Sequence, residues 1–327
     1  MRTEGRHIVK KTAKNGKKTG KTIKAGRHGN QDALFDRMER ILERVERLIT
    51  PPDEEAGIDV SLFRDYIAFR WGRHGKGGRL TPVDHPHLFD LDDLVGIDDA
   101  KEELIRNTAQ FTAGYPANNV LLWGERGTGK SSCIKGLLRP FAPRGLRMVE
   151  VQKGDLLEIT EILRLLRGAP WRFILFCDDL AFDEGEVSYR ELKAILEGGI
   201  EARPENVLLY ATSNRRHLMP EPMNDNLGRE IHPEEAVSEK LSLADRFGLT
   251  LSFYPFSQDT YLSIVERYAE RMGLAIERDR LRSEALRWAL FKGQRSGRSA
   301  RQFMDDLAGR LAMEAGRENP EDAFGTS

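Results

Sequence analysis

The sequence predicts an α/β fold with three layers, in which a parallel sheet lies between helices on both of its faces. From about residue 90 to residue 255, short apolar runs alternate with amphipathic helical segments, which is the pattern of repeated β–α–β units. The runs are apolar throughout rather than at every second position, as expected of strands that are buried on both faces. Beyond residue 255 the pattern is helical only.

The apolar runs and the helical segments divide this part of the chain into two expected domains. An α/β domain over residues 90–255 is expected to contain the strands 120–123, 146–151, 173–177, 207–212 and 249–253. A small helical domain is expected over residues 256–315, with Ser257 as the N-cap of its first helix. This first helix is expected to end near residue 272, and two further helices are expected over 283–292 and 299–315. A flexible tail is expected over 316–327.

The region before the α/β domain, residues 31–89, is expected to be helical. An apolar stripe with steps of three and four residues predicts a helix that Pro51 ends, and it is formed by Phe35, Met38, Leu42, Val45 and Ile49. This helix either packs on its own chain or makes a short coiled-coil contact between subunits. A second helical patch is expected at Phe63, Tyr66, Phe69 and Trp71, followed by a flexible glycine-rich joint at residues 72–78.

The first thirty residues, Met1 to Asn30, form a basic arm. They contain many lysines and arginines, one acidic residue and almost no large apolar side chains, so we expect this arm to be disordered. Its charge is about +9, against about −10 for the rest of the chain, while the whole chain has a net charge of −1. The arm is expected either to contact nucleic acid or an acidic partner nonspecifically, or to be a solvated extension.

The composition is that of a soluble globular protein. Hydrophobic residues make up 39% of the chain and charged residues 31%, and the mean hydropathy is −0.52. No apolar run reaches the roughly 18 residues that a membrane span needs, and no apolar segment follows the basic arm, so neither a membrane protein nor a secreted one is expected. Cys133 and Cys177 are then expected to be reduced core thiols of a cytoplasmic protein.

A glycine-rich segment, residues 124–131, connects the expected strand 120–123 to a helix and matches the P-loop (Walker A) pattern. In this context the backbone N–H groups face phosphate oxygens. Lys130 is expected to reach the β and γ phosphates of ATP, and the Ser131 hydroxyl to bind Mg²⁺. The residues expected to surround the nucleotide are Gly124, Glu125, Arg126, Gly127, Thr128, Gly129, Lys130, Ser131 and Ser132.

Two carboxylates, Asp178 and Asp179, end the apolar run 173–177, as in a Walker B motif. The carboxyl end of a central parallel strand is where ligands bind in open α/β sheets. Asp178 is expected to hold Mg²⁺ and Asp179 to polarise the attacking water. An aspartate is one methylene shorter than the glutamate that is common at this place, so the sequence predicts binding of ATP more directly than hydrolysis. Alternatively the two acids only cap the following turn.

The remaining site residues rest on a resemblance, because the order of the motifs is that of AAA+ ATPases. Asn214, after the run 207–212, resembles the residue called sensor 1, although an Asn at the end of a strand is also a common turn residue. Arg246 stands where these proteins present an arginine finger to a neighbouring subunit's ATP, or it pairs with an acid of its own chain. Arg298, or as second choice Arg301, resembles the lid arginine called sensor 2.

The segment Val95, Gly96 and Ile97 is similar to the one that lies over adenine in this superfamily, although a hydrophobic turn explains the same residues. More narrowly, residues 116–124, 176–180, 211–218 and 230–233 resemble a bacterial AAA+ family catalogued as a domain of unknown function. The resemblance covers roughly residues 61–311. It implies ATP and Mg²⁺ as cofactors and a homo-oligomer, as a ring or a partial ring.

Three functions are compatible with these residues. The first is an oligomeric ATPase that hydrolyses ATP between subunits and acts on a macromolecular client. The second is an ATP-dependent switch or loader with little hydrolysis, which the shorter Asp179 favours. The third is a P-loop kinase for a small molecule. It would need a lid and an acceptor pocket between the sheet and the inserted loops, whereas the C-terminal helices with Arg298 resemble an AAA+ lid more closely.

Overall fold

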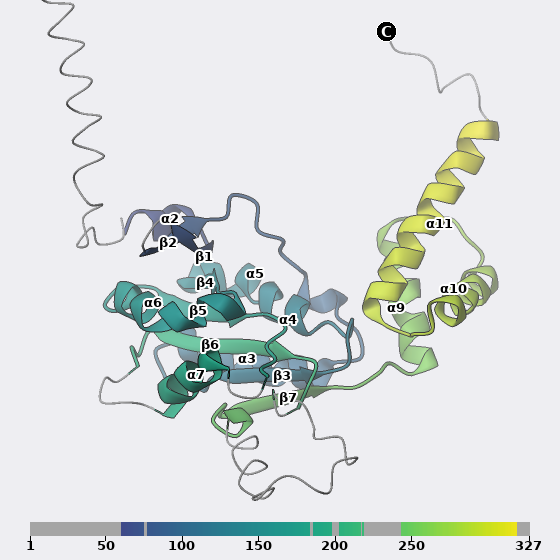
Figure 1. The fold of residues 1–327 in the computed structure, drawn as a ribbon. Coiled ribbons are helices and arrows are strands. Elements are labelled where there is room, and N and C mark those ends of the chain that lie inside the picture. The colour runs from purple at the N-terminus through teal and green to yellow at the C-terminus, as the bar shows by residue number, and fades with distance from the viewer. Residues whose placement is uncertain are drawn as a thin grey trace, which may run out of the picture. The chain divides into compact units, whose positions relative to one another are not determined.

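A mostly parallel sheet forms the centre of the fold (Figure 1). The computed structural model describes residues 60–74, 77–183, 186–197, 203–216, 218 and 243–318, all within one compact unit, Ile58–Ser327. In these residues the sheet has seven strands in the order β2-β1-β4-β5-β6-β3-β7, and only β2 runs antiparallel to its neighbour. The strands are β1 (Ala68–His74), β2 (Gly77–Pro82), β3 (Val120–Gly124), β4 (Leu146–Glu150), β5 (Arg172–Cys177), β6 (Val207–Ser213) and β7 (Leu249–Phe253).

Both faces of the sheet are covered by helices, which gives three layers. Along β5, Phe173 and Leu175 enter one apolar cluster, whereas Ile174 and Phe176 enter another on the opposite face. The first cluster includes side chains of α6 (Ile159–Leu166) and α7 (Val187–Glu197). The second includes side chains of α3 (Asp98–Thr112), α4 (Lys130–Gly136) and α5 (Leu138–Phe141). The predicted α/β fold with a parallel sheet is therefore confirmed.

The C-terminal helices, called the lid below, have a core of their own. The helices are α9 (Gln258–Arg271), α10 (Arg278–Lys292) and α11 (Gly297–Glu318), and they pack through a third apolar cluster that contains Tyr261, Ala285 and Phe303 (Figure 1). The Ser257 side chain accepts a hydrogen bond from the backbone N–H of Thr260, so the predicted N-cap is confirmed. α11 extends three residues beyond the expected end of the lid, into the expected tail.

The remaining short elements are connections. Three 3₁₀ turns are η1 (Leu91–Asp93), η2 (Ala142–Arg144) and η3 (Lys153–Glu158). Both cysteines are buried in the sheet and its helices, and burial raises the pKa of each thiol to about 12, as expected of inert core thiols. No helix in the described part of the chain is long and apolar enough to span a bilayer.

The prediction of a helical patch and a flexible joint before residue 90 is wrong for the described residues. Only α2 (Leu62–Asp65) is helical. Phe69 and Trp71 lie on β1, two residues apart and both buried in the same cluster, which is the period of a strand. The glycine-rich stretch belongs to the hairpin of β1 and β2, since Gly72 pairs with Arg79 and Arg73 with Gly78. The sheet of the α/β domain therefore begins at residue 68 rather than after residue 90.

The basic arm and the stripe from Phe35 to Ile49 lie outside the described residues.

Because Phe63 of α2 packs against β1 and β5, Phe63→Ala should destabilise the whole α/β domain. The Phe63 side chain is 1% exposed, and its ring lies 4.9 Å from the rings of Phe69 and Phe173. We expect the free energy of unfolding, measured in urea, to fall by about 3–5 kcal/mol, since truncation leaves a cavity. Val60→Ala is the control, because Val60 is 50% exposed and should change it by less than about 0.5 kcal/mol. Equal effects of the two substitutions would show that α2 does not belong to this core.

Candidate nucleotide-binding site

The P-loop follows β3 directly and has a backbone that only glycine adopts easily. Gly124 has a φ of 134°, and a Cβ on it would lie 2.0 Å from the carbonyl oxygen of Phe253 on the adjacent strand β7. Gly127 has a φ of 76°, and a Cβ there would lie 2.9 Å from the Ser296 side chain, just before the lid helix α11. The glycines therefore let the loop pass closely between the sheet and the lid.

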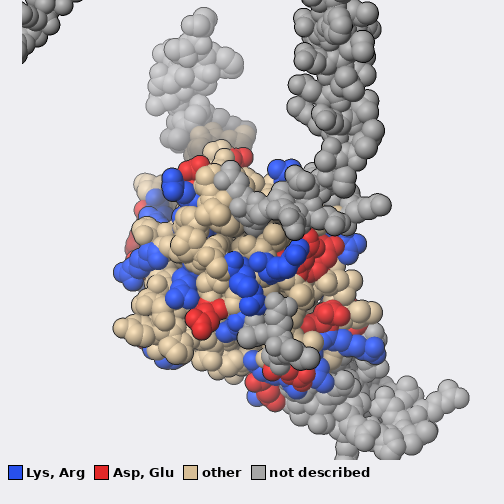
Figure 2. All heavy atoms as spheres, turned by 90° about the vertical axis from the view of Figure 1, so that its left-hand side faces the viewer, with Lys and Arg blue, Asp and Glu red and all other residues tan. Residues whose placement is uncertain are grey.

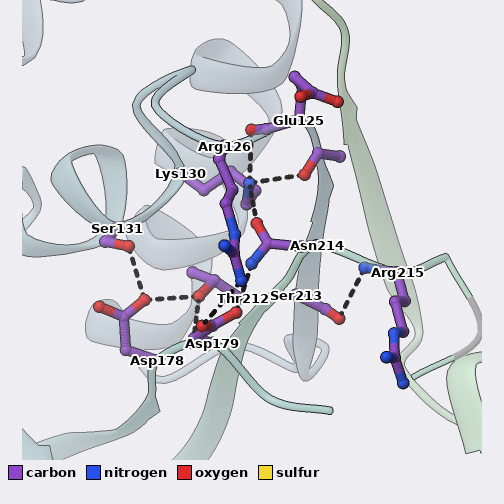
Figure 3. A network of polar contacts seen from close by, with 11 residues as sticks. Glu125, Arg126, Lys130, Ser131, Asp178, Asp179, Thr212, Ser213, Asn214 and Arg215 are labelled. Carbon is purple, nitrogen blue, oxygen red and sulfur yellow. Dashed lines mark hydrogen bonds and ion pairs between the residues drawn. The ribbon is translucent and has the colours of Figure 1, made fainter. Parts of the chain in front are cut away.

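Lys130 lies at the centre of the site. Its ammonium donates to the carbonyl oxygens of Gly124 at 2.8 Å and Glu125 at 2.7 Å, and to Asn214 Oδ1 at 3.2 Å (Figure 3). The side chain is largely buried, and this burial lowers the pKa of Lys130, although the carboxylates of Asp179, Glu125 and Asp178 oppose the shift. A cation is thus held beside the loop with its three protons directed at oxygen atoms.

Asp178 joins the P-loop helix to the sheet. Its Oδ1 accepts hydrogen bonds from the hydroxyls of Ser131 on α4 and Thr212 on β6, both at 2.6 Å. Mg²⁺ prefers oxygen ligands of this kind and is usually bound by one or two protein groups together with phosphates. The donor set at this position fits a magnesium ion that accompanies a nucleotide.

Asn214 connects Lys130 to the second acid, Asp179. While its Oδ1 accepts from Lys130, its Nδ2 donates to Asp179 Oδ1, so that the three side chains form a row (Figure 3). Asp179 Oδ2 also lies 4.0 Å from an Arg126 guanidinium nitrogen, and the Asp179 side chain is 62% exposed. Asp179 has a φ of 52°, which is uncommon for a residue with a Cβ. The structure therefore brings both predicted acids to the P-loop, with the second facing solvent.

A cavity of about 940 Å³ runs from these residues to the lid. Its volume lies within the range of ligand sites, roughly 300–1,000 Å³. It is lined by the P-loop from Arg126 to Ser132, the two acids, Asn214, and residues of the lid. Because the cavity joins a glycine cradle to a pair of magnesium-type oxygen ligands, the residues present fit ATP with Mg²⁺.

The segment predicted to lie over adenine borders the same cavity. Val95 and Ile97 line it, and Ile97 Cδ1 is within 3.8 Å of the position of a Cβ on Gly129. Gly96 does not line the cavity but lies against the lid, where a Cβ would meet the Thr260 side chain at 2.3 Å. This segment therefore packs between the P-loop and α9.

The two lid arginines both line the cavity, in different settings. Arg298 stands beside the P-loop, because the backbone N–H of Gly297 donates to the carbonyl oxygen of Gly127 at 2.8 Å. No carboxylate of the described residues forms an ion pair with Arg298. Arg301 donates to Asp305 at 2.9 Å, and its guanidinium lies 5.6 Å from the centre of the Tyr268 ring. The geometry thus leaves Arg298 the more available of the two.

Arg246 lies apart from the cavity of its own chain. Its guanidinium pairs with Glu197 at the end of α7, and its side chain is 26% exposed. The alternative of an intramolecular pair is therefore present, with Glu197 as the acid.

Sequence reasoning missed several residues of this site. Thr212 lies two positions before Asn214, and residues two apart share one face of a strand, so a signal for it existed. Tyr268, Arg271 and Met272 of the lid also line the cavity, and Arg271 pairs with Asp93, which is another lining residue. No local pattern marks these lid residues, because only tertiary packing brings them to the P-loop.

Comparison with solved structures finds similar folds at low sequence identity. The RuvB Holliday junction branch migration motor of Thermotoga maritima is 19% identical, with a TM-score of 0.40, over 67% of this chain and 72% of that one. The Orc1 protein of Aeropyrum pernix, in complex with DNA, is 18% identical, with a TM-score of 0.46, over 69% of this chain and 61% of that one.

No curated protein matches the chain. The family model described as "Protein of unknown function (DUF815)" matches residues 64–311. Since this match covers most of the chain, the protein belongs to the DUF815 family.

Proposed function

We propose that this protein binds ATP with Mg²⁺ and hydrolyses it as an ATPase of the AAA+ type. One observation carries the proposal: the row of Lys130, Asn214 and Asp179 lies beside the contact between Ser131 and Asp178 at the same cavity. A cation, a neutral amide, a carboxylate and two magnesium-type oxygen ligands are the groups that phosphoryl transfer to water requires.

The P-loop residues would hold the phosphates. Backbone N–H groups between Glu125 and Ser132 would face the phosphate oxygens, and Lys130 would exchange its carbonyl partners for oxygens of the β and γ phosphates. Ser131 and Asp178 would hold Mg²⁺, which neutralises the charge that develops on the phosphates. The low exposure of Lys130 strengthens its attraction for phosphate, because little water screens it.

Asp179 and Asn214 would act on the attacking water. The Asp179 carboxylate would accept a proton from water as the new O–P bond forms and the bond between the γ phosphorus and the ADP oxygen breaks. Asn214 would orient this water or contact the γ phosphate, since its amide already bridges the lysine and the carboxylate. The short side chain of Asp179 keeps the second function open, that of a switch with little hydrolysis.

The lid would complete the nucleotide site. Backbone atoms of Val95 to Ile97 would lie over the adenine, and Arg298 would reach the γ phosphate from the start of α11, where Gly297 is bonded to Gly127. Arg301 is the second choice for this role, since it is paired with Asp305.

Arg246 would serve a neighbouring subunit. Because Arg246 lies outside the cavity of its own chain, it can reach a nucleotide only if subunits assemble side by side, as a ring or a partial ring.

The client of the ATPase would be a macromolecule, and the location of the protein would be the cytoplasm. Basic and acidic side chains are interspersed on the face shown in Figure 2. We assign nonspecific nucleic-acid contact to the basic arm Met1–Asn30, because of its charge of about +9.

Asp179→Asn should separate hydrolysis from binding. The amide cannot accept the proton, so we expect phosphate release to fall by about 10² or more, while the affinity for ATP stays close to that of the wild type. Asp65→Asn, at an exposed acid on α2, is the matched control. Wild-type and variant rates that both equal the background, with ATP still bound, would instead support the switch. Turnover that requires an added metabolite would support the kinase.

Arg246→Ala should abolish turnover and leave ATP binding intact. The loss expected for an arginine finger is about 10³-fold or more. Co-expression of Arg246→Ala with Lys130→Ala should restore part of the activity, because one interface of the mixed oligomer then has an intact P-loop and an intact finger. Glu197→Ala, which removes the acid that Arg246 contacts, should retain turnover. Loss of ATP binding in Arg246→Ala, or no recovery in the mixture, would exclude a finger acting between subunits.

A further inference from the structure

Thr212 contacts both acids of the site through one buried hydroxyl. It lies near the carboxyl end of β6, and the residue is 2% exposed. Its Oγ1 is 2.6 Å from Asp178 Oδ1 and 2.9 Å from the backbone nitrogen of Asp179. The threonine carbonyl oxygen accepts from the backbone N–H of Leu180 at 2.7 Å. One residue of β6 therefore holds three consecutive residues that follow β5.

The direction of these hydrogen bonds is fixed by the groups involved. A threonine hydroxyl has one proton and two lone pairs, whereas a backbone N–H is a donor only. The hydroxyl must accept from Asp179, so its single proton is directed at Asp178. A hydrogen bond of this kind to a carboxylate is short and strong. Asp178 Oδ1 is thus held by the hydroxyls of Thr212 and Ser131 together.

The same hydroxyl stabilises the turn that orients the Asp179 side chain. A residue with a Cβ is rarely found at a φ of 52°, unless the surroundings determine its backbone. Here the hydrogen bond from the Asp179 N–H to Thr212 accompanies that conformation. The Asp179 side chain then faces Asn214 and Arg126. The aspartate side chain is short. The backbone conformation of Asp179 therefore decides whether its carboxylate can contact the nucleotide.

We infer that Thr212 is a positioning residue, which orients Asp178 for Mg²⁺ and Asp179 for the attacking water. The inference rests on the proposed function. It adds a residue of the cavity lining whose hydroxyl is directed at the two acids, so that it acts through both carboxylates.

The test compares three variants of the full chain in Mg²⁺ titrations of ATP turnover. Thr212→Val keeps the shape but removes the hydroxyl, so the Mg²⁺ concentration for half-maximal turnover should rise about 10–100-fold, as for other groups that orient metal ligands. Its turnover at saturating Mg²⁺ should also fall, while its ATP affinity in EDTA stays unchanged. Thr212→Ser restores the hydroxyl and should recover most of both properties.

Thr108→Val controls for the loss of a buried hydroxyl elsewhere. Thr108 is also fully buried, and its hydroxyl contacts the Leu104 carbonyl and the Tyr210 hydroxyl on α3 and β6, away from the acids. It should lower stability without changing the Mg²⁺ requirement. A wild-type Mg²⁺ requirement and turnover in Thr212→Val, or the same defect in Thr212→Ser or Thr108→Val, would overturn the inference.

ATP binding and phosphate release by the wild-type protein test the proposed function separately from the role of Thr212. If the wild type binds ATP but releases no phosphate, hydrolysis is excluded, and the Mg²⁺ dependence of ATP binding becomes the readout for Thr212. If the wild type binds no ATP with Mg²⁺ present, the proposed function fails and the inference fails with it.

Discussion

The site depends on the order and register of three parallel strands. β6 lies between β5 and β3, with Cys177 opposite Ala211 and Trp123 opposite Ser213. The residues that follow these positions therefore emerge at one edge of the sheet. This arrangement places the P-loop next to Asn214, and the two acids next to Thr212. A shift of one residue in either pairing would move the side chains to the opposite face and separate the groups.

Opposite charges at this edge are held together by a neutral group. The ammonium of Lys130 and the carboxylate of Asp179 both contact Asn214, whose amide offers an acceptor to one and a donor to the other. An amide can make both contacts because it has a donor at one end and an acceptor at the other. The exposed carboxylate and the buried ammonium then have different surroundings: solvent for the first, the loop carbonyls for the second.

The sequence predicts the edge of the sheet at which the candidate site lies well, because its signals are local. The strands β3 to β7 agree with the apolar runs to within one residue at each end, and the P-loop, both acids and Asn214 each follow such a run. The sequence does not distinguish helix from strand before residue 90, because the steps of three, three and two residues from Phe63 to Trp71 fit both. Pairing of β1 with β4, which lies far along the chain, decides between them.

Residues that meet only through tertiary packing could not be predicted. Tyr268 and Arg271 reach the cavity because α9 packs against the segment around Val95, and no period in the sequence reports that contact. The partner of Arg246 is likewise 49 residues away, at the end of α7. The roles of Arg246, Arg298 and Arg301 stay predictions, because they depend on a bound nucleotide and on neighbouring subunits.

A calorimetric titration of the full chain with ATP, in the presence of Mg²⁺ and in EDTA, tests the proposed ATP binding directly. If the protein binds ATP as proposed, binding is saturable, tighter with Mg²⁺, and lost in Lys130→Ala, since the buried ammonium is the main attraction for the phosphates. Binding of equal strength in Lys130→Ala, or no binding by the wild type with Mg²⁺, would contradict it.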